Sequence, residues 1–191
     1  MERIPYRATL LAAPYSGLRL PVSILLDNVR SMYNVGAFFR TADGAGIERL
    51  LLSGITARPP KNAITKTALG AEARVPWDPV AHPPDTVAKL RAEGYEIAAV
   101  ETSTRAVDIF DWQPRFPVCV LFGHEVDGLA LSLLDLCDTH IRIPMLGLKH
   151  SLNVASAGAI VMYELLRKYR ALHPELNGSR FLDGDAPPVP L

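Results

Sequence analysis

The stretch IRIPMLGLKHSLNVASAGAIVMYELL, residues 141–166, joins a short apolar run to an amphipathic helix through a Pro-Gly loop. The part 141–148 is predicted to be a strand that ends in this loop, and the apolar stripe after it predicts a helix over 152–170. Ser151 and Asn153 stand at the start of that helix. Their side chains can cap the free N–H groups of its first turn, and the same groups can bind a polar ligand.

Strand and helix patterns alternate along the rest of the chain. Continuous apolar runs, typical of strands that are covered on both faces, lie at 22–27, 49–54, 95–101, 117–123 and 140–144. Helices are predicted at 34–46, 83–94, 129–137 and 152–170, and the second of them has Asp85 as a candidate cap. This order predicts an α/β fold with a mostly parallel sheet and helices on both faces.

The charges are unevenly distributed although the formal net charge is zero. Residues 1–70 carry nine Lys and Arg against four Asp and Glu, whereas residues 71–191 carry eleven against sixteen. A basic first third on an otherwise neutral chain is compatible with a face that binds nucleic acid. The alternative is that the charged residues are unevenly distributed by chance.

Composition limits the setting of the protein and the kind of site. At 191 residues and 49% hydrophobic, the chain is expected to form one domain, and no apolar run approaches the roughly 20 residues that span a bilayer. The N-terminus does not resemble a secretory signal. Cys119 and Cys137 have no metal-ligand spacing, so we expect idle thiols of a cytoplasmic protein without a metal site. The tail 173–191, rich in Pro, Gly and Asp, is predicted to be disordered.

Unusual residues follow three of the predicted strands, in the segments 27–42, 122–130 and 143–153. Because ligands of open α/β sheets bind beyond the carboxyl ends of the strands, we expect these segments to form one site. None contains a glycine-rich phosphate loop, and there is no Ser-His-Asp set with a nucleophile elbow. The common nucleotide-binding and hydrolase classes are therefore disfavoured.

Together, the three segments resemble the motifs of the SpoU/TrmH family of RNA 2′-O-ribose methyltransferases, within the SPOUT superfamily. The matching letters are NVGA with RTA (34–42), LFGHE with GL (121–129), IPM with SLN (143–153) and, more loosely, ALGA (68–71). Each motif alone is weak, but the three occur in the family's order and spacing. The resemblance runs from about residue 20 to about residue 170.

The resemblance implies an α/β fold with a C-terminal trefoil knot, in a single SPOUT methyltransferase domain over residues 1–172 with an N-terminal extension over 1–20. It implies S-adenosylmethionine as cofactor, a ribose 2′-hydroxyl of tRNA or rRNA as methyl acceptor, and a homodimer. Many relatives carry an extra N-terminal RNA-binding domain, and the roughly 20 residues before the first predicted strand are expected to be too few to form one. We therefore expect the basic first third to help select the RNA.

The resemblance also assigns roles to individual residues. Arg40 is the expected catalytic residue, and since a guanidinium is a poor base, we expect it to hold an RNA phosphate and stabilise the developing alkoxide. Asn34, Glu125, Ser151 and Asn153 are expected to shape the pocket, orient Arg40 and contact RNA or the second subunit. Cofactor-binding positions are expected at Thr102, Leu121, Gly123, Ile143, Met145 and Leu152.

Some alternatives stay open on the sequence alone. A protein with the same fold that only binds or assembles RNA would be expected to lose some of the motif residues, yet they are present. An unrelated α/β enzyme would not bind S-adenosylmethionine. The small residues 155–159 fit a close approach at a knot or dimer and ordinary helix packing equally well. His124 and His150 fall outside the motif pattern and are predicted to lie on the surface.

Overall fold

The computed structural model describes residues 19–177, and its centre is a parallel sheet of seven strands. The strand order is β3-β2-β1-β6-β4-β7-β5, and every neighbouring pair is parallel. The strands are β1 (Leu20–Asp27), β2 (Ile47–Ser53), β3 (Trp77–Val80), β4 (Glu96–Val100), β5 (Val107–Asp108), β6 (Val118–Phe122) and β7 (Thr139–Arg142). The predicted parallel α/β sheet is confirmed.

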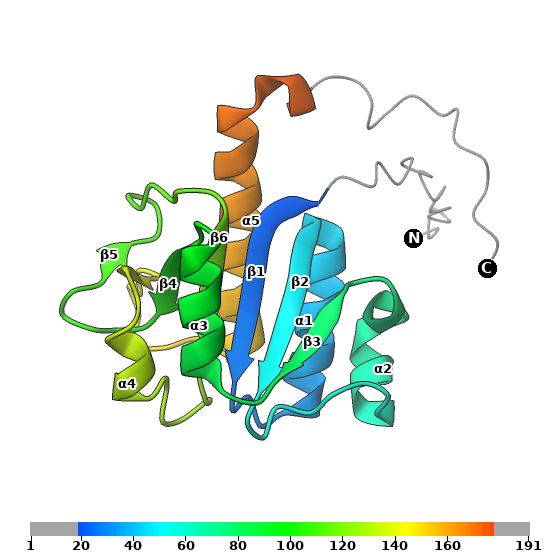
Figure 1. Cartoon of the computed structure of the whole chain (residues 1–191). Helices are drawn as coiled ribbons and strands as arrows, with labels where there is room; N and C mark the ends of the chain where they lie inside the picture. Colours follow the sequence, from blue (N-terminus) through cyan, green and yellow to red (C-terminus); the bar gives the residue numbers. More distant parts are fainter. Residues whose placement is uncertain (1–18, 178–191) are drawn as a thin grey trace, which may run out of the picture.

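Helices cover both faces of this sheet (Figure 1). One face carries α1 (Met32–Ala45) and α5 (Val154–Leu172), with α2 (Asn62–Ala68) packed on α1. The other face carries α3 (Pro83–Ala92) and α4 (Leu131–Leu134). Two short 3-10 turns complete the described part, η1 (Ala71–Ala73) and η2 (Pro174–Asn177).

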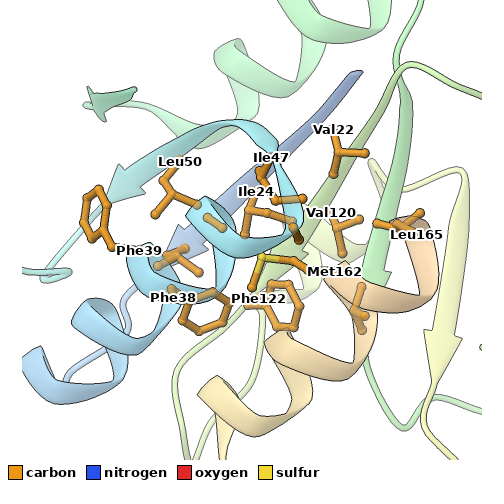
Figure 2. Close-up of a cluster of buried hydrophobic side chains, with 14 of the residues drawn as sticks. Val22, Ile24, Phe38, Phe39, Ile47, Leu50, Val120, Phe122, Met162 and Leu165 are labelled. Carbon is orange, nitrogen blue, oxygen red and sulfur yellow. The ribbon is translucent and has the colours of Figure 1, made fainter. Parts of the chain in front are cut away.

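The core forms two layers because successive side chains of a strand point to opposite faces. Ile24 and Leu26 of β1 face α1 and α5, whereas Leu25 faces α3 and α4. Figure 2 shows the first layer, in which Phe38 of α1 meets Phe122 of β6 edge to face with ring centroids 5.1 Å apart. Burial of such apolar surface is the main stabilising contribution to a fold of this size.

Close packing of α1 on α5 explains one small residue at the start of α5. A Cβ at Gly158 would lie 2.3 Å from the ring of Phe38, so any side chain there would separate the two helices. For this position, packing within the chain accounts for the small residue. Whether the segment 155–159 also meets a second subunit is a separate proposal.

Several predicted elements differ from the structure. The helix expected over 129–137 is the four-residue α4, and α3 has His82, not Asp85, at its N-cap. Residues 174–177 form η2, so disorder was wrongly predicted for that part of the tail. Residues 1–18 and 178–191 lie outside the described residues, and the trefoil knot stays a prediction because strand order does not determine threading. In the described range, no helix is both long and apolar enough to cross a membrane.

Candidate active site at the carboxyl edge of the sheet

A cavity of about 400 Å³ lies beyond the carboxyl ends of β4, β6 and β7, beside the start of α5. In Figure 1 this edge is where the arrowhead of β1 points. Four segments supply the lining, within 100–102, 122–128, 142–145 and 150–157. The volume is typical of small-molecule sites, which range from about 300 to 1,000 Å³.

Five of the six predicted cofactor-binding residues line this cavity, namely Thr102, Gly123, Ile143, Met145 and Leu152. Leu121 does not. Its side chain is fully buried in the layer that packs on α3 and α4. Because alternate residues of β6 face opposite sides, Phe122 reaches the cavity and Leu121 does not.

Gly123 is required by the backbone that lies against it. A Cβ at this position would come within 2.3 Å of the carbonyl carbon of Gly128. The loop folds back on itself there, since the N–H of His124 donates to Gly128 O at 3.1 Å and the N–H of Gly128 donates to His124 O at 2.9 Å. Gly123 was expected to bind the cofactor, and the close approach observed at this position is between two parts of one loop.

Hydrogen bonds join the three motifs at one end of the cavity. Glu125 Oε2 accepts the N–H of Arg30 at 2.9 Å, and its Oε1 accepts the N–H of Ser31 and the Nδ2 of Asn34, each at 3.0 Å. Asn34 Oδ1 in turn accepts from Asn153 Nδ2 at 3.1 Å. Glu125, Asn34 and Asn153, which are far apart in sequence, therefore form one connected set.

These donors fix the charge of Glu125. Partial burial raises the pKa of its carboxyl, but the backbone N–H groups of Arg30, Ser31 and Glu125 itself and the amide of Asn34 outweigh burial and lower the pKa to about 2. The carboxylate also lies beside the start of α1, where the helix dipole favours a negative charge. Glu125 is thus a permanent anion at neutral pH that positions Asn34.

The two polar residues before α5 have different roles. Asn153 is the N-cap, and its Oδ1 accepts the N–H of Ala155 at 2.9 Å and of Ser156 at 3.3 Å. Ser151 is exposed, lines the cavity and makes no hydrogen bond with any residue of the described chain. Capping by Ser151 was therefore a wrong prediction, and its hydroxyl is available to a ligand.

Arg40 lies apart from the other predicted catalytic residues. It is exposed on α1, is not part of the cavity lining, and pairs with no residue in the range 19–177. Glu125, Ser151 and Asn153 line the cavity, and Asn34 reaches it through its bonds to Glu125 and Asn153.

Five charged or histidine residues of the lining were not predicted as site residues: Glu101, His124, Asp127, Arg142 and His150. His150 is exposed as expected, but the side chain of His124 is only 18% exposed, so its surface placement was wrong. Its Nδ1 accepts the N–H groups of Val126 and Asp127 at 3.3 and 3.2 Å, which stabilises the loop. Glu101 ends the apolar run 95–101, and this position at the carboxyl end of a strand could have identified it as a site residue.

Metal-ligating side chains do not cluster in this part of the molecule. Within residues 19–177, no group of three or more His, Cys, Asp and Glu is placed to hold an ion. Cys119 and Cys137 are free thiols, and burial raises the pKa of each, of Cys137 to about 12.

Comparison with known proteins gives the same assignment as the motifs. Residues 21–163 match the model of the SpoU rRNA Methylase family. A Staphylococcus epidermidis protein, named as a member of the TrmH family of tRNA/rRNA methyltransferases, is 32% identical over 154 residues, which cover 81% of this chain and 61% of that protein.

Solved structures share the fold. An AdoMet-bound rRNA methyltransferase from Sinorhizobium meliloti has a TM-score of 0.72 at 31% identity, covering 76% of this chain and 56% of that one. An RNA 2′-O ribose methyltransferase has a TM-score of 0.70 at 25% identity, covering 77% and 56%. The chain thus spans less than two thirds of each of these relatives. Since the family model matches most of its length, the chain belongs to the SpoU rRNA methylase family.

Proposed function

We propose that the chain is an S-adenosylmethionine-dependent methyltransferase that acts on a ribose 2′-hydroxyl of tRNA or rRNA. The observation that carries the proposal is the cavity at which the three sequence motifs meet and are joined by Glu125, Asn34 and Asn153. The AdoMet bound to the S. meliloti relative supports the cofactor. The 2′-O ribose methyltransferase among the structural neighbours supports the acceptor.

The lining suits this cofactor chemically. Ile143, Met145 and Leu152 form an apolar wall of the kind that holds an adenine ring, and Glu101 and Thr102 add polar groups on the side of β4. When bound, the cofactor supplies an electrophilic methyl group on a positively charged sulfur. Glu125 keeps Asn34 in place, and the free hydroxyl of Ser151 is positioned to contact the ribose or the cofactor.

Arg40 is proposed to hold an RNA phosphate and to stabilise negative charge on the reacting oxygen. Its guanidinium is a poor base, so removal of the proton is assigned to no residue. Because Arg40 lies outside the cavity lining of its own chain, we propose that it acts on a site shared between two chains of a homodimer.

Exposed apolar side chains on the two helices support that homodimer. Tyr33 of α1 is 56% exposed, and Ile160 and Tyr163 of α5 are 37% and 52% exposed. Sedimentation should give the mass of a dimer. Mixed dimers with Arg40→Ala on one chain and Asn153→Ala on the other should regain methyl transfer at one of the two sites. A monomer that methylates RNA would contradict the shared site.

Calorimetry with S-adenosylmethionine and with its demethylated product tests the cofactor. Both should bind, and ligand at about 100 times its dissociation constant should stabilise the fold by roughly 2.7 kcal/mol. If neither binds, the proposed function is wrong. Binding without methyl transfer to any RNA would instead indicate an RNA-binding protein with an inactive pocket. We also propose a cytoplasmic location, which the two unpaired thiols support.

A further inference from the structure

We propose that Glu101 makes the cavity prefer the positively charged cofactor over its neutral product. The inference rests on the proposed function and adds a specificity-determining residue that the motifs do not include. Methyl transfer to a hydroxyl oxygen converts the sulfonium of the cofactor to an uncharged thioether and releases the hydroxyl proton. A fixed negative charge in the cavity therefore attracts the ligand before the reaction and loses that attraction afterwards.

The carboxylate of Glu101 is held at the cavity wall with one oxygen free. Glu101 follows directly after β4 and is half-buried, and its Oε1 accepts the N–H of Leu129 at 2.9 Å. Its Oε2 has no partner among the described residues. Because no buried side-chain polar atom of the described residues lacks a partner, this free oxygen must be open to solvent. Since Glu101 lines the cavity, a ligand there can meet it.

The other carboxylates of the lining are less suited to this role. Glu125 is already bound by the N–H groups of Arg30 and Ser31 and by the amide of Asn34. The side chain of Asp127 is 81% exposed, so water and salt screen its charge. Glu101 combines partial burial, a free oxygen and no ion pair with any described residue.

The charge of Glu101 acts on a cationic ligand without direct contact. Coulomb attraction falls only with the inverse of distance, so it acts wherever in a cavity of about 400 Å³ the sulfur lies. Arg142, which lines the same cavity and is exposed, opposes the effect in part, and so does either His124 or His150 when protonated. For the partly screened attraction between Glu101 and the sulfonium, we expect the cavity to bind the charged cofactor about tenfold more tightly than the neutral product.

Glu101→Gln tests the proposal, because it removes the charge and keeps an acceptor for the N–H of Leu129. Dissociation constants are measured by calorimetry for S-adenosylmethionine, for sinefungin, whose ammonium replaces the sulfonium, and for the neutral product S-adenosylhomocysteine. The two charged ligands should bind about tenfold more weakly to the variant, and the product less than about twofold more weakly. A second variant, Glu101→Asp, keeps the charge and should keep the preference.

Other outcomes separate this inference from the proposed function. Equal weakening of all three ligands would show a role in hydrogen bonding or loop structure and would overturn the inference, as would three unchanged constants. If the unsubstituted protein binds none of the ligands, the proposed function itself fails. The matched control is Asp127→Asn, which removes a carboxylate from the same lining and should change no constant by more than about twofold.

Discussion

Two regions of the described chain, residues 30–74 and residues 82–177, differ in how many of their Lys and Arg side chains form ion pairs. Between residues 30 and 74, only Arg49 has an ion pair with another described residue, at 3.9 Å from Asp78. The exposed cations without such a pair are Arg30, Arg40, Arg58, Lys61, Lys66 and Arg74. Between residues 82 and 177, ion pairs hold Lys89, Arg91, Arg115, Arg167 and Lys168. Arg142 and Lys149 of this second region are exposed without an ion pair to a described residue.

Cations of the second region that are ion-paired therefore serve the fold, whereas nearly all those of the first region are available to a ligand. Lys168 is only 7% exposed, and its Nζ donates to the carbonyls of Phe110, at 3.1 Å, and Trp112. Of the unpaired cations, Arg40 lies on α1 and Lys66 on α2, two helices on the same side of the sheet (Figure 1). Phosphate contacts dominate the affinity of proteins for nucleic acids, so we infer that this side meets the RNA.

The largest effect is expected at Arg40, the unpaired cation that lies within the first motif, 34–42. Arg40→Ala should lower single-turnover methyl transfer by at least about 100-fold, since it removes stabilisation of the reacting oxygen. Cofactor affinity should stay within a few fold, and Arg40→Lys should recover little because a point charge does not replace the planar guanidinium. Near-normal turnover by either variant would exclude Arg40 from the mechanism.

Removal of a paired cation should affect stability instead. Lys168→Ala leaves Glu164 and two carbonyls without their buried donor, and we expect the free energy of unfolding to fall by about 3 kcal/mol. The control is Arg167→Ala, which breaks the more exposed pair with the same Glu164 and should lower the free energy of unfolding by clearly less. Urea unfolding measures both. If both variants lose the same free energy of unfolding, burial does not decide how much an ion pair contributes here, and the prediction is wrong.

Removal of unpaired cations on α2 should weaken RNA binding without unfolding the protein. The double variant Lys61→Ala and Lys66→Ala should bind RNA about tenfold more weakly. The slope of the logarithm of the binding constant against the logarithm of salt concentration should fall by the equivalent of one to two phosphate contacts, on the order of 0.7 to 0.9 for each. Lys89→Ala, which removes a lysine paired with Glu93 on α3, is the matched control. If the control weakens binding as much, the RNA does not prefer the unpaired side.

The smallest effect is expected from the titration of Glu125. Its pKa is lowered from 4.5 to about 2 in the folded state, so its contribution to stability is complete above about pH 4.5 and is lost as the pH falls towards 2. Glu125→Gln should therefore flatten the dependence of unfolding free energy on pH in that window. Unfolding midpoints measured across it give the slope, and an unchanged slope would show that the carboxylate gains nothing from its donors.

The long elements of the fold were predictable because their patterns are strong. Strands β1, β2, β4 and β6 contain continuous apolar runs, and α1 and α5 carry clear apolar stripes. Strand β3 contains Asp78 and Pro79, β5 has two residues, and α2 has seven residues without a side-chain cap, so none gives a pattern of its own. These elements form because the neighbouring strands and α1 provide a surface for them.

The sequence motifs predicted many of the residues that line the cavity, but not the hydrogen bonds among them. Motif spacing placed Glu125 and Asn153 in one site, but their common contact with Asn34 depends on tertiary structure. Leu121 belongs to the motif but not to the cavity lining, because alternate residues of β6 face opposite layers. Glu101 was missed because it lies outside every motif.

The most direct test of the account is analysis of the methylated product. RNA from cells that lack the protein is incubated with it and with cofactor carrying a labelled methyl group, and the RNA is then hydrolysed with alkali. A methylated 2′-hydroxyl prevents cleavage of the adjacent phosphodiester, so the label should appear in alkali-resistant dinucleotides, and Arg40→Ala should give none. Label recovered in mononucleotides would place the methyl group on a base and would contradict the proposed ribose 2′-O activity.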